Sequence, residues 1–368
     1  MTSPIVIAAG GTGGHFFPAE ALAAELMRRG RRVVLMTDAR SAGDRSAVFA
    51  PCERHVIKGA GIAGRGVVRA GRAMLALILG VFQARGILRR LKPAAVVGFG
   101  GYPSVAPVIA ARLVSPRPRV VLHEQNAVLG RANKALCRFA DALALSFPVT
   151  TRVPAGIEAV CVGNPVRPAI AAQSGGSVDP PYEGFNLLVL GGSLGARVFS
   201  TLIPEAISHL PEPHRARLRL TQQVRAEDLA TVRGLYAEMG LAAELQPFFA
   251  DVASLLVQSH LVIARAGAST VAELAAIGRP AILVPLPGAI DDHQRANARA
   301  LAEAGGAWMM DQSSLFAADL ADFIARLMAE PETLGPVGQA AFSFARLEAA
   351  QHLADLVEHT LIAQETAT

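Results

Sequence analysis

Near its N-terminus the chain reads IVIAAGGTGGH over residues 5–15. The apolar run at 5–9 is typical of a buried strand, and the glycines after it allow a sharp turn into a helix. Backbone N–H groups at the start of such a helix favour an anion. This stretch therefore predicts a doubly wound α/β fold with an anion site after its first strand.

The same pattern recurs along the 368 residues, where apolar runs rich in Val, Ile and Leu alternate with helical patterns. Strands are expected at 5–9, 33–37, 95–98, 119–122, 142–145, 186–190, 217–220, 261–264 and 281–284. Helices are expected at 18–29, 73–90, 104–114, 130–140, 195–209, 226–239, 269–277, 292–304, 315–329 and 334–364. Proline and glycine near residues 163–181 mark a linker. We expect two doubly wound Rossmann-like domains with an interdomain cleft.

Glycine-rich turns follow predicted strands at 10–15, 98–102, 191–195 and 265–270, which favours binding of phosphate or diphosphate. No G-x-x-x-x-G-K-[ST] motif occurs, which excludes a P-loop NTPase. The first turn and Asp38 resemble a dinucleotide site, but Phe16 stands where its third glycine belongs. A nicotinamide-dependent dehydrogenase remains the alternative enzyme class.

Basic residues are concentrated in the first half of the chain. Residues 1–166 hold 22 Lys and Arg against 8 Asp and Glu, whereas residues 167–368 hold 13 against 22. This asymmetry indicates an anionic partner for the first half.

The three cysteines form no CxxC pair, which favours a reducing compartment, and the N-terminus has no signal-peptide pattern.

The uncharged segment at 73–84 is too short to span a membrane and lies among arginines. We expect a helix that rests on an anionic membrane surface, with a core helix as the alternative. Aromatic residues are scarce here, so nucleic acid is not an expected partner. A non-catalytic membrane-binding module stays open as a third class of function. The expected membrane residues are Arg72, Leu75, Leu79, Phe82 and Arg85.

Polar residues after other strands complete the predicted site. Glu273 falls one turn into a helix, where it could accept hydrogen bonds from a ribose or complement the helix dipole. The run Asp291-Asp292-His293 could bind a metal ion or begin a helix. Because the chain has no D-x-D pair, we prefer a site without metal or cofactor, in which helix N-termini and Arg167 offset the diphosphate charge.

Seven motifs in order make the chain resemble the bacterial MurG family, the UDP-N-acetylglucosamine:lipid I N-acetylglucosaminyltransferases. They are GGTGGH (10–15), GFGGYPS (98–104), HEQN (123–126), GNPVR (163–167), GGSLGA (191–196), RAGASTVAE (265–273) and DDHQRANA (291–298). Leu194, where the family usually has Gln, and the GYPSVAP turn depart from its pattern.

The resemblance implies the glycosyltransferase B fold, with residues 1–164 binding acceptor and membrane and residues 165–345 binding UDP-N-acetylglucosamine. A final helix at about 346–364 would pack on the first domain. It also implies inverting transfer to the C4 hydroxyl of lipid I, giving lipid II for peptidoglycan synthesis. The protein would act at the cytoplasmic face of the plasma membrane, with other cell-wall enzymes as partners.

The resemblance assigns site residues one by one. Ser193 and Ala268, Ser269 and Thr270 would meet the donor diphosphate, the Phe249 backbone would meet uracil, and Glu273 would meet ribose. Gln294 and Asn126 would bind the sugar hydroxyls, and Arg167 would lie near the nucleotide. Facing the acceptor diphosphate would be Thr12, Gly13, Gly14, Gly100, Gly101 and Tyr102.

The acceptor hydroxyl needs a general base, and His15 is the preferred candidate. It stands at a predicted helix N-terminus, where the positive end of the dipole favours a neutral ring that can accept a proton. Glu124 is the alternative base. The alternative for His15 is a structural role, in which it only caps or lines the turn.

Overall fold

The computed structural model describes residues 3–10, 13–39, 46–57, 67–175, 178–192 and 195–365. The chain forms two compact domains and crosses between them twice. The first domain comprises Met1–Arg167 and Arg346–Thr368, and the second comprises Pro168–Ala345. The first crossing falls in the GNPVR segment, within the linker that the sequence predicts.

In the described part of the first domain, seven parallel strands form one sheet in the order β3-β2-β1-β4-β5-β6-β7. The inner strand β1 pairs with β2 and β4, so that Ile5 lies opposite Val33 on one side and Ala95 on the other. The strands are β1 (Ile5–Ala8), β2 (Val33–Thr37), β3 (Glu53–Val56), β4 (Ala95–Gly98), β5 (Arg119–Glu124), β6 (Ala142–Leu145) and β7 (Glu158–Cys161).

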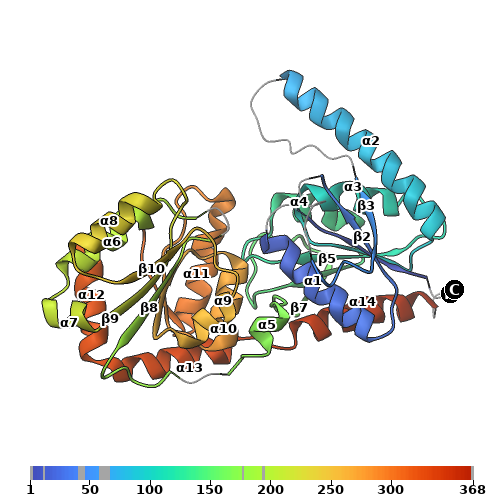
Figure 1. The fold of residues 1–368 in the computed structure, drawn as a ribbon. Helices are drawn as coiled ribbons and strands as arrows, with labels where there is room; N and C mark the ends of the chain where they lie inside the picture. The colour runs from blue at the N-terminus through green and yellow to red at the C-terminus, as the bar shows by residue number, and fades with distance from the viewer. Residues whose placement is uncertain are drawn as a thin grey trace. The chain divides into compact units, whose positions relative to one another are not determined.

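Helices cover both faces of this sheet (Figure 1). Because successive strand residues point to opposite faces, Ile5 and Ile7 pack with α1 and α14, whereas Val6 packs with α2 and α3. Both faces are therefore apolar, as in other doubly wound sheets. The helices are α1 (Gly13–Arg28), α2 (Val67–Leu91), α3 (Gly101–Ala111), α4 (Arg131–Leu136), the 3₁₀ turn η1 (Cys137–Phe139) and α14 (Ala349–Glu365).

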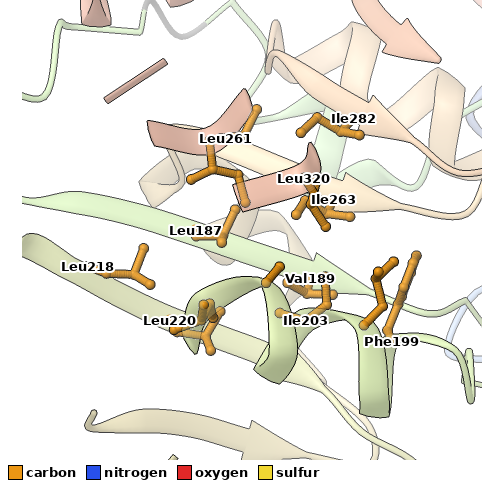
Figure 2. Packing of buried hydrophobic residues seen from close by; sticks show 14 of the residues in the cluster. Leu187, Val189, Phe199, Ile203, Leu218, Leu220, Leu261, Ile263, Ile282 and Leu320 are labelled. Carbon is orange, nitrogen blue, oxygen red and sulfur yellow. The ribbon is translucent and has the colours of Figure 1, made fainter. Parts of the chain in front are cut away.

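The second domain repeats the architecture. Its described strands form a parallel sheet of six in the order β10-β9-β8-β11-β12-β13. On one face, Leu187 and Val189 of β8 pack with Phe199 and Ile203 of α6 and with Leu320 of α12 (Figure 2). The strands are β8 (Phe185–Leu190), β9 (Leu218–Gln223), β10 (Ala243–Gln246), β11 (Leu261–Ala264), β12 (Ala281–Leu283) and β13 (Ala307–Met309).

The helices of the second domain connect these strands and cover the sheet. They are α5 (Pro168–Ala171), α6 (Phe199–His209), α7 (Glu212–Arg217), α8 (Leu229–Glu238), α9 (Val252–Gln258), α10 (Ala268–Ile277), the 3₁₀ turn η2 (Ile290–Asp292), α11 (His293–Glu303), α12 (Ala317–Ala329), the 3₁₀ turn η3 (Pro331–Thr333) and α13 (Leu334–Phe344). The sequence predicts one helix over 334–364, but α13 ends and α14 begins on either side of the second crossing.

The strand order reverses at one point in each sheet, between β1 and β4 and between β8 and β11. Ligands of open parallel sheets bind beside such reversals, at the carboxyl ends of the strands. The glycine turns at 10–15 and 98–102 follow β1 and β4, and those at 191–195 and 265–270 follow β8 and β11. Each sheet thus carries two of the predicted anion-binding turns at its reversal point.

Candidate active site

Two glycine turns meet the start of α1 at the reversal point of the first sheet. The Ser104 hydroxyl donates to the carbonyl oxygens of Ala8 and Gly100, at 2.8 and 2.9 Å, and so joins the ends of β1 and β4. Gly101 has a φ of +65°, and a Cβ there would lie 3.8 Å from Nε2 of His15. The turn after β4 therefore lies against the ring of His15.

The HEQN segment, which follows from β5, supplies the next contacts. His15 Nδ1 lies 2.7 Å from Oε1 of Gln125, and Gln125 Nε2 lies 2.9 Å from Nδ1 of His123. His123 and Gln125 are buried, and His123 Nε2 donates to the carbonyl oxygen of Gly163. Burial lowers the pKa of His123 to about 4, so its ring is neutral at pH 7.

Glu124 is buried and surrounded by hydrogen-bond donors. Its Oε1 accepts from the backbone and side-chain nitrogens of Asn126, at 3.0 and 3.1 Å. Its Oε2 accepts from the backbone nitrogen of Gly130 and from Nδ2 of Asn133, both at 2.9 Å. This carboxylate holds the loop between β5 and α4 in place.

Other predicted residues of the first domain lie around the same edge of the sheet. Gly13 and Gly14 form the first residues of α1, and Tyr102 is exposed at the start of α3. The guanidinium of Arg167 stands over the ring of Phe17, 5.0 Å from its centroid, and thus beside α1. Thr12 lies outside the described residues.

In the second domain, α10 directs its N-terminus to the carboxyl edge of the sheet, just after β11. Gly267 caps the helix in an extended conformation, so Ala268, Ser269 and Thr270 form its first turn. The Ser269 hydroxyl is buried and makes no hydrogen bond within the described part of the chain. Together with the helix dipole, this turn can receive an anionic group.

Glu273 and Phe249 are both buried in the second domain. Glu273 lies in the middle of α10, and Phe249 lies in the loop that follows the edge strand β10. A Cβ at Gly191, after β8, would collide with the backbone nitrogen of Ala196, so this turn requires glycine. Ser193, predicted in the same turn, lies outside the described residues.

The segment after β12 begins α11. Gln294 Oε1 accepts from the backbone nitrogen of Leu286 at 3.0 Å, which ties the helix to the preceding loop. Asp292 pairs with Arg295, and His293 Nδ1 lies 2.7 Å from the carbonyl oxygen of Ile290. Within the described ranges, no group of three or more His, Cys, Asp and Glu side chains could hold a metal ion.

The helix α2 has two apolar faces. Ala84, Ile87 and Leu88 point into the core of the first domain. The opposite side exposes a row that we call the α2 apolar face, and Figure 1 shows the first part of this helix extending beyond α3. The α2 apolar face consists of Met74, Leu75, Ile78, Leu79 and Phe82, exposed by 53%, 58%, 45%, 48% and 64%.

Arginines 72, 89 and 90 are exposed on the same helix, and Arg85 donates from Nε to the carbonyl oxygen of Leu113. By length and composition, Gly71–Leu91 is long and apolar enough to cross a membrane, with a mean hydropathy of 1.4 over its most apolar window. The prediction that this segment is too short to span a membrane considered residues 73–84 alone, whereas the helix is longer and its other face packs on the domain core.

Comparison with known proteins places both domains in one class. The model of the glycosyltransferase family 28 N-terminal domain matches residues 5–145, and that of its C-terminal domain matches residues 186–355. Two Rossmann-like domains of these families define a glycosyltransferase of the B fold. A glycosyltransferase of this class is neither a nicotinamide-dependent dehydrogenase nor a non-catalytic membrane-binding module. Both alternatives that the sequence left open are therefore wrong.

Individual relatives narrow the assignment. The chain is 60% identical over 97% of its length to a protein of Granulibacter bethesdensis, and 55% identical to one of Acidiphilium cryptum, covering 94% and 96% of those proteins. Both are named UDP-N-acetylglucosamine--N-acetylmuramyl-(pentapeptide) pyrophosphoryl-undecaprenol N-acetylglucosamine transferase. The crystal structure of Acinetobacter baumannii MurG superposes with a TM-score of 0.77 at 32% identity, covering 98% of this chain and 100% of that one. The chain belongs to the MurG family of glycosyltransferases.

Proposed function

We propose that this protein transfers N-acetylglucosamine from UDP-N-acetylglucosamine to the C4 hydroxyl of the muramoyl sugar of lipid I, giving lipid II. The observation that carries this proposal is the 60% identity, over nearly the full chain, to a transferase named for that donor and acceptor. The glycine turns at both sheet reversals support it, because donor and acceptor each contain a diphosphate.

The donor binds mainly to the second domain in this proposal. The first turn of α10, with Ser193 from the turn after β8, receives the diphosphate. The Phe249 backbone pairs with uracil, Glu273 accepts hydrogen bonds from ribose, and Gln294 binds the sugar. The buried hydroxyl of Ser269, which has no hydrogen-bond partner among the described residues, supports the diphosphate assignment, because a phosphate oxygen would satisfy it.

The acceptor binds to the first domain, at the turns after β1 and β4. Thr12, Gly13, Gly14 and the turn Gly100–Tyr102 face its diphosphate. Asn126 and Arg167 complete the donor side from the HEQN and GNPVR segments. Helix N-termini and Arg167 offset negative charge on the leaving UDP, so the reaction needs no metal ion and no cofactor.

His15 is the general base. As the C4 oxygen attacks the anomeric carbon, its proton passes to Nε2 of His15, and the electron pair of the breaking bond leaves with the β-phosphate oxygen of UDP. The closeness of Nε2 to Gly101 supports this role, because a residue without a side chain leaves space beside that atom. The hydrogen bonds on Glu124 favour a structural role for that residue instead.

The protein works at the cytoplasmic face of the plasma membrane, where the α2 apolar face and nearby arginines meet anionic lipid. An isoprenoid tail cannot leave the bilayer without exposing methylenes at about 0.8 kcal/mol each, so the enzyme must approach the surface. The free state of Cys52, Cys137 and Cys161 suits a reducing compartment.

A transfer assay tests the function directly. Radiolabelled UDP-N-acetylglucosamine and a lipid I analogue should yield labelled lipid II, in EDTA as well as in its absence. In a thermal-shift series, UDP and UDP-N-acetylglucosamine should stabilise the protein, and NAD(P) should not. Absence of transfer, or stabilisation by NAD(P) alone, would overturn the proposal; activity that is lost with EDTA and restored by magnesium would overturn the metal-free mechanism.

A further inference from the structure

Gln125 connects His15 to the interior of the first domain. Its amide oxygen faces Nδ1 of His15 at 2.7 Å, and its amide nitrogen faces Nδ1 of His123 at 2.9 Å. The amide also lies 3.0 Å from the backbone carbonyl of His123. With His123 and Gln125 buried, these contacts form a continuous hydrogen-bonded path from the domain interior to the ring of His15.

The contact with a carbonyl group decides which way the amide of Gln125 points. A carbonyl oxygen only accepts hydrogen bonds, so the NH₂ group of Gln125 must be the end that faces His123. The reversed amide would place two oxygen acceptors 3.0 Å apart in a buried site. The amide oxygen is therefore held toward His15.

His123 keeps this arrangement in a single protonation state. Its Nδ1 accepts from the Gln125 amide, so the ring hydrogen lies on Nε2 and is donated to the Gly163 carbonyl at 3.1 Å. The Ser146 hydroxyl lies 3.3 Å from the same Nε2. A second ring proton would turn Nδ1 into a donor against the NH₂ group of Gln125, and burial already lowers the pKa of His123 to about 4.

The fixed oxygen of Gln125 then dictates the tautomer of His15. An amide oxygen cannot donate, so Nδ1 of His15 must carry the ring hydrogen. In the neutral ring this leaves the lone pair on Nε2, the atom that faces Gly101. With Nδ1 engaged on the buried side, the basic atom points toward the turn after β4.

We propose that Gln125 is a positioning residue that fixes His15 as the Nδ1–H tautomer, so that Nε2 is the atom that accepts the acceptor's proton. This inference rests on the proposed function and adds to it the residue that prepares the base. Gln125 touches neither reacting atom in this scheme and acts through His15.

Nitrogen NMR of ¹⁵N-histidine-labelled full-length protein tests the tautomer independently of activity, with His15→Ala used to assign the signal. The wild type should show neutral His15 protonated at Nδ1. Gln125→Met, which keeps the side-chain length but cannot accept the hydrogen bond, should shift His15 toward the Nε2–H form. Gln125→Glu keeps an oxygen acceptor toward Nδ1 of His15 and should keep the Nδ1–H form, with its second carboxyl oxygen protonated so that it can donate to the His123 carbonyl.

Turnover gives the second readout. Gln125→Met should lower kcat on the order of 10²-fold with an unchanged KM for UDP-N-acetylglucosamine, as expected when a general base is misdirected. The matched control is Gln222→Met: Gln222 is buried in the second domain and bonded at both amide ends, to the Phe199 carbonyl and to Tyr236. It should leave the His15 tautomer unchanged.

A wild-type His15 protonated at Nε2 would overturn the inference, and so would a Gln125→Met protein that retains both the Nδ1–H form and the wild-type kcat. If Gln125→Met fails to fold, the His15 tautomer measured in the wild type and in Gln125→Glu still tests the inference. A protein with no transfer activity but with Nδ1–H fixed by Gln125 would refute the proposed function alone. His15→Ala with normal kcat would refute the base assignment alone.

Discussion

Glu124 and Gln125 are neighbours in the chain but act on different parts of the first-domain site. The Glu124 carboxylate accepts hydrogen bonds from Asn126, Gly130 and Asn133 and orders the loop after β5. Gln125 reaches across 110 positions of sequence to His15. The HEQN motif can be recognised in the sequence. The role of Gln125 could not be predicted from it, because that role depends on this long-range contact with His15.

His15→Ala should lower turnover by about 10²–10⁴-fold and leave UDP affinity almost intact, because a general base acts in the chemical step. Steady-state kinetics with a lipid I analogue, together with calorimetric titration of UDP, would measure both quantities. Glu124→Gln is the comparison: if it reduces kcat more than His15→Ala while the protein stays folded, the base is Glu124.

Glu273→Ala should raise the KM for UDP-N-acetylglucosamine and leave the KM for the acceptor unchanged. Two charge-assisted hydrogen bonds to ribose would be lost, which costs on the order of 2–4 kcal/mol in donor binding. Initial rates with each substrate varied in turn would separate the effects. The exposed Glu238, on α8, gives the control Glu238→Ala; an equal change in both variants would contradict the ribose assignment.

At the scale of elements, buried strands were the easiest to predict. β2, β4, β6 and β11 begin and end where the sequence places them, because each is a continuous apolar run with every residue buried. The edge strands β3 and β7 of the first sheet and β10 and β13 of the second were missed, and their sequences are ERHV, EAVC, AELQ and AWM. Each edge strand pairs with one neighbour only, and none of them is a run of buried apolar residues like those of the inner strands.

The α2 helix shows why its environment could not be predicted from hydrophobicity. Its apolar residues cover two faces, and the tertiary structure buries one and exposes the other. A sequence pattern cannot distinguish such a helix from one that is buried on all sides. Only the exposed fractions of the side chains on the α2 apolar face show that this helix is not a core helix buried on all sides.

Replacing Leu79 and Phe82 by Ser, or Arg72 and Arg85 by Glu, should weaken binding to anionic vesicles and lower activity on long-tailed acceptors. Each arginine contributes about 1 kcal/mol of attraction that salt screens. Activity on a short, water-soluble acceptor should survive. Vesicle sedimentation and paired transfer assays would measure these effects, with Phe316→Ser and Arg233→Glu, exposed in the second domain, as controls.

Vesicle binding that is unchanged in both sets of α2 variants would place the membrane contact elsewhere. Equal loss of activity on short and long acceptors would show that the substitutions damage the fold instead.

At the scale of the whole molecule, α14 returns from the end of the second domain and completes the first. Leu353 and Val357 enter the core beside α1, and Arg29, which directly follows α1, reaches Asp355 and Glu358 at 2.6 and 2.8 Å. Arg29 also pairs with Glu25, which is buried next to it. These charges link the first helix of the domain to the last.

Acid should weaken the ion pairs of Glu25 at the end of α1. The hydrogen bond from Arg28, with help from Arg29, lowers the pKa of Glu25 from 4.5 to about 2. A carboxylate with a depressed folded-state pKa stabilises the fold above its unfolded pKa and loses that contribution as pH falls through the folded value. The melting temperature of the wild type should therefore fall between about pH 4.5 and 2.

Glu25→Gln should lower the melting temperature at pH 7 and flatten its decline in acid. Calorimetric melts at several pH values would measure both effects, with Glu238→Gln as an exposed control. A Glu25→Gln protein whose acid profile parallels that of the wild type would show that this cluster does not contribute to the pH dependence.

The separation of α14 from the rest of its domain also bears on how the protein is made. The ribosome releases β1 to β7 before the second domain, but α14 follows Ala345. At ~5–20 residues per second, the intervening segment takes roughly 10–35 s to synthesise. During that interval the second domain, which is continuous, can finish folding while the apolar surface of β4, β5 and β6 awaits its cover. The half of the chain that is translated first is thus the last to reach its native state.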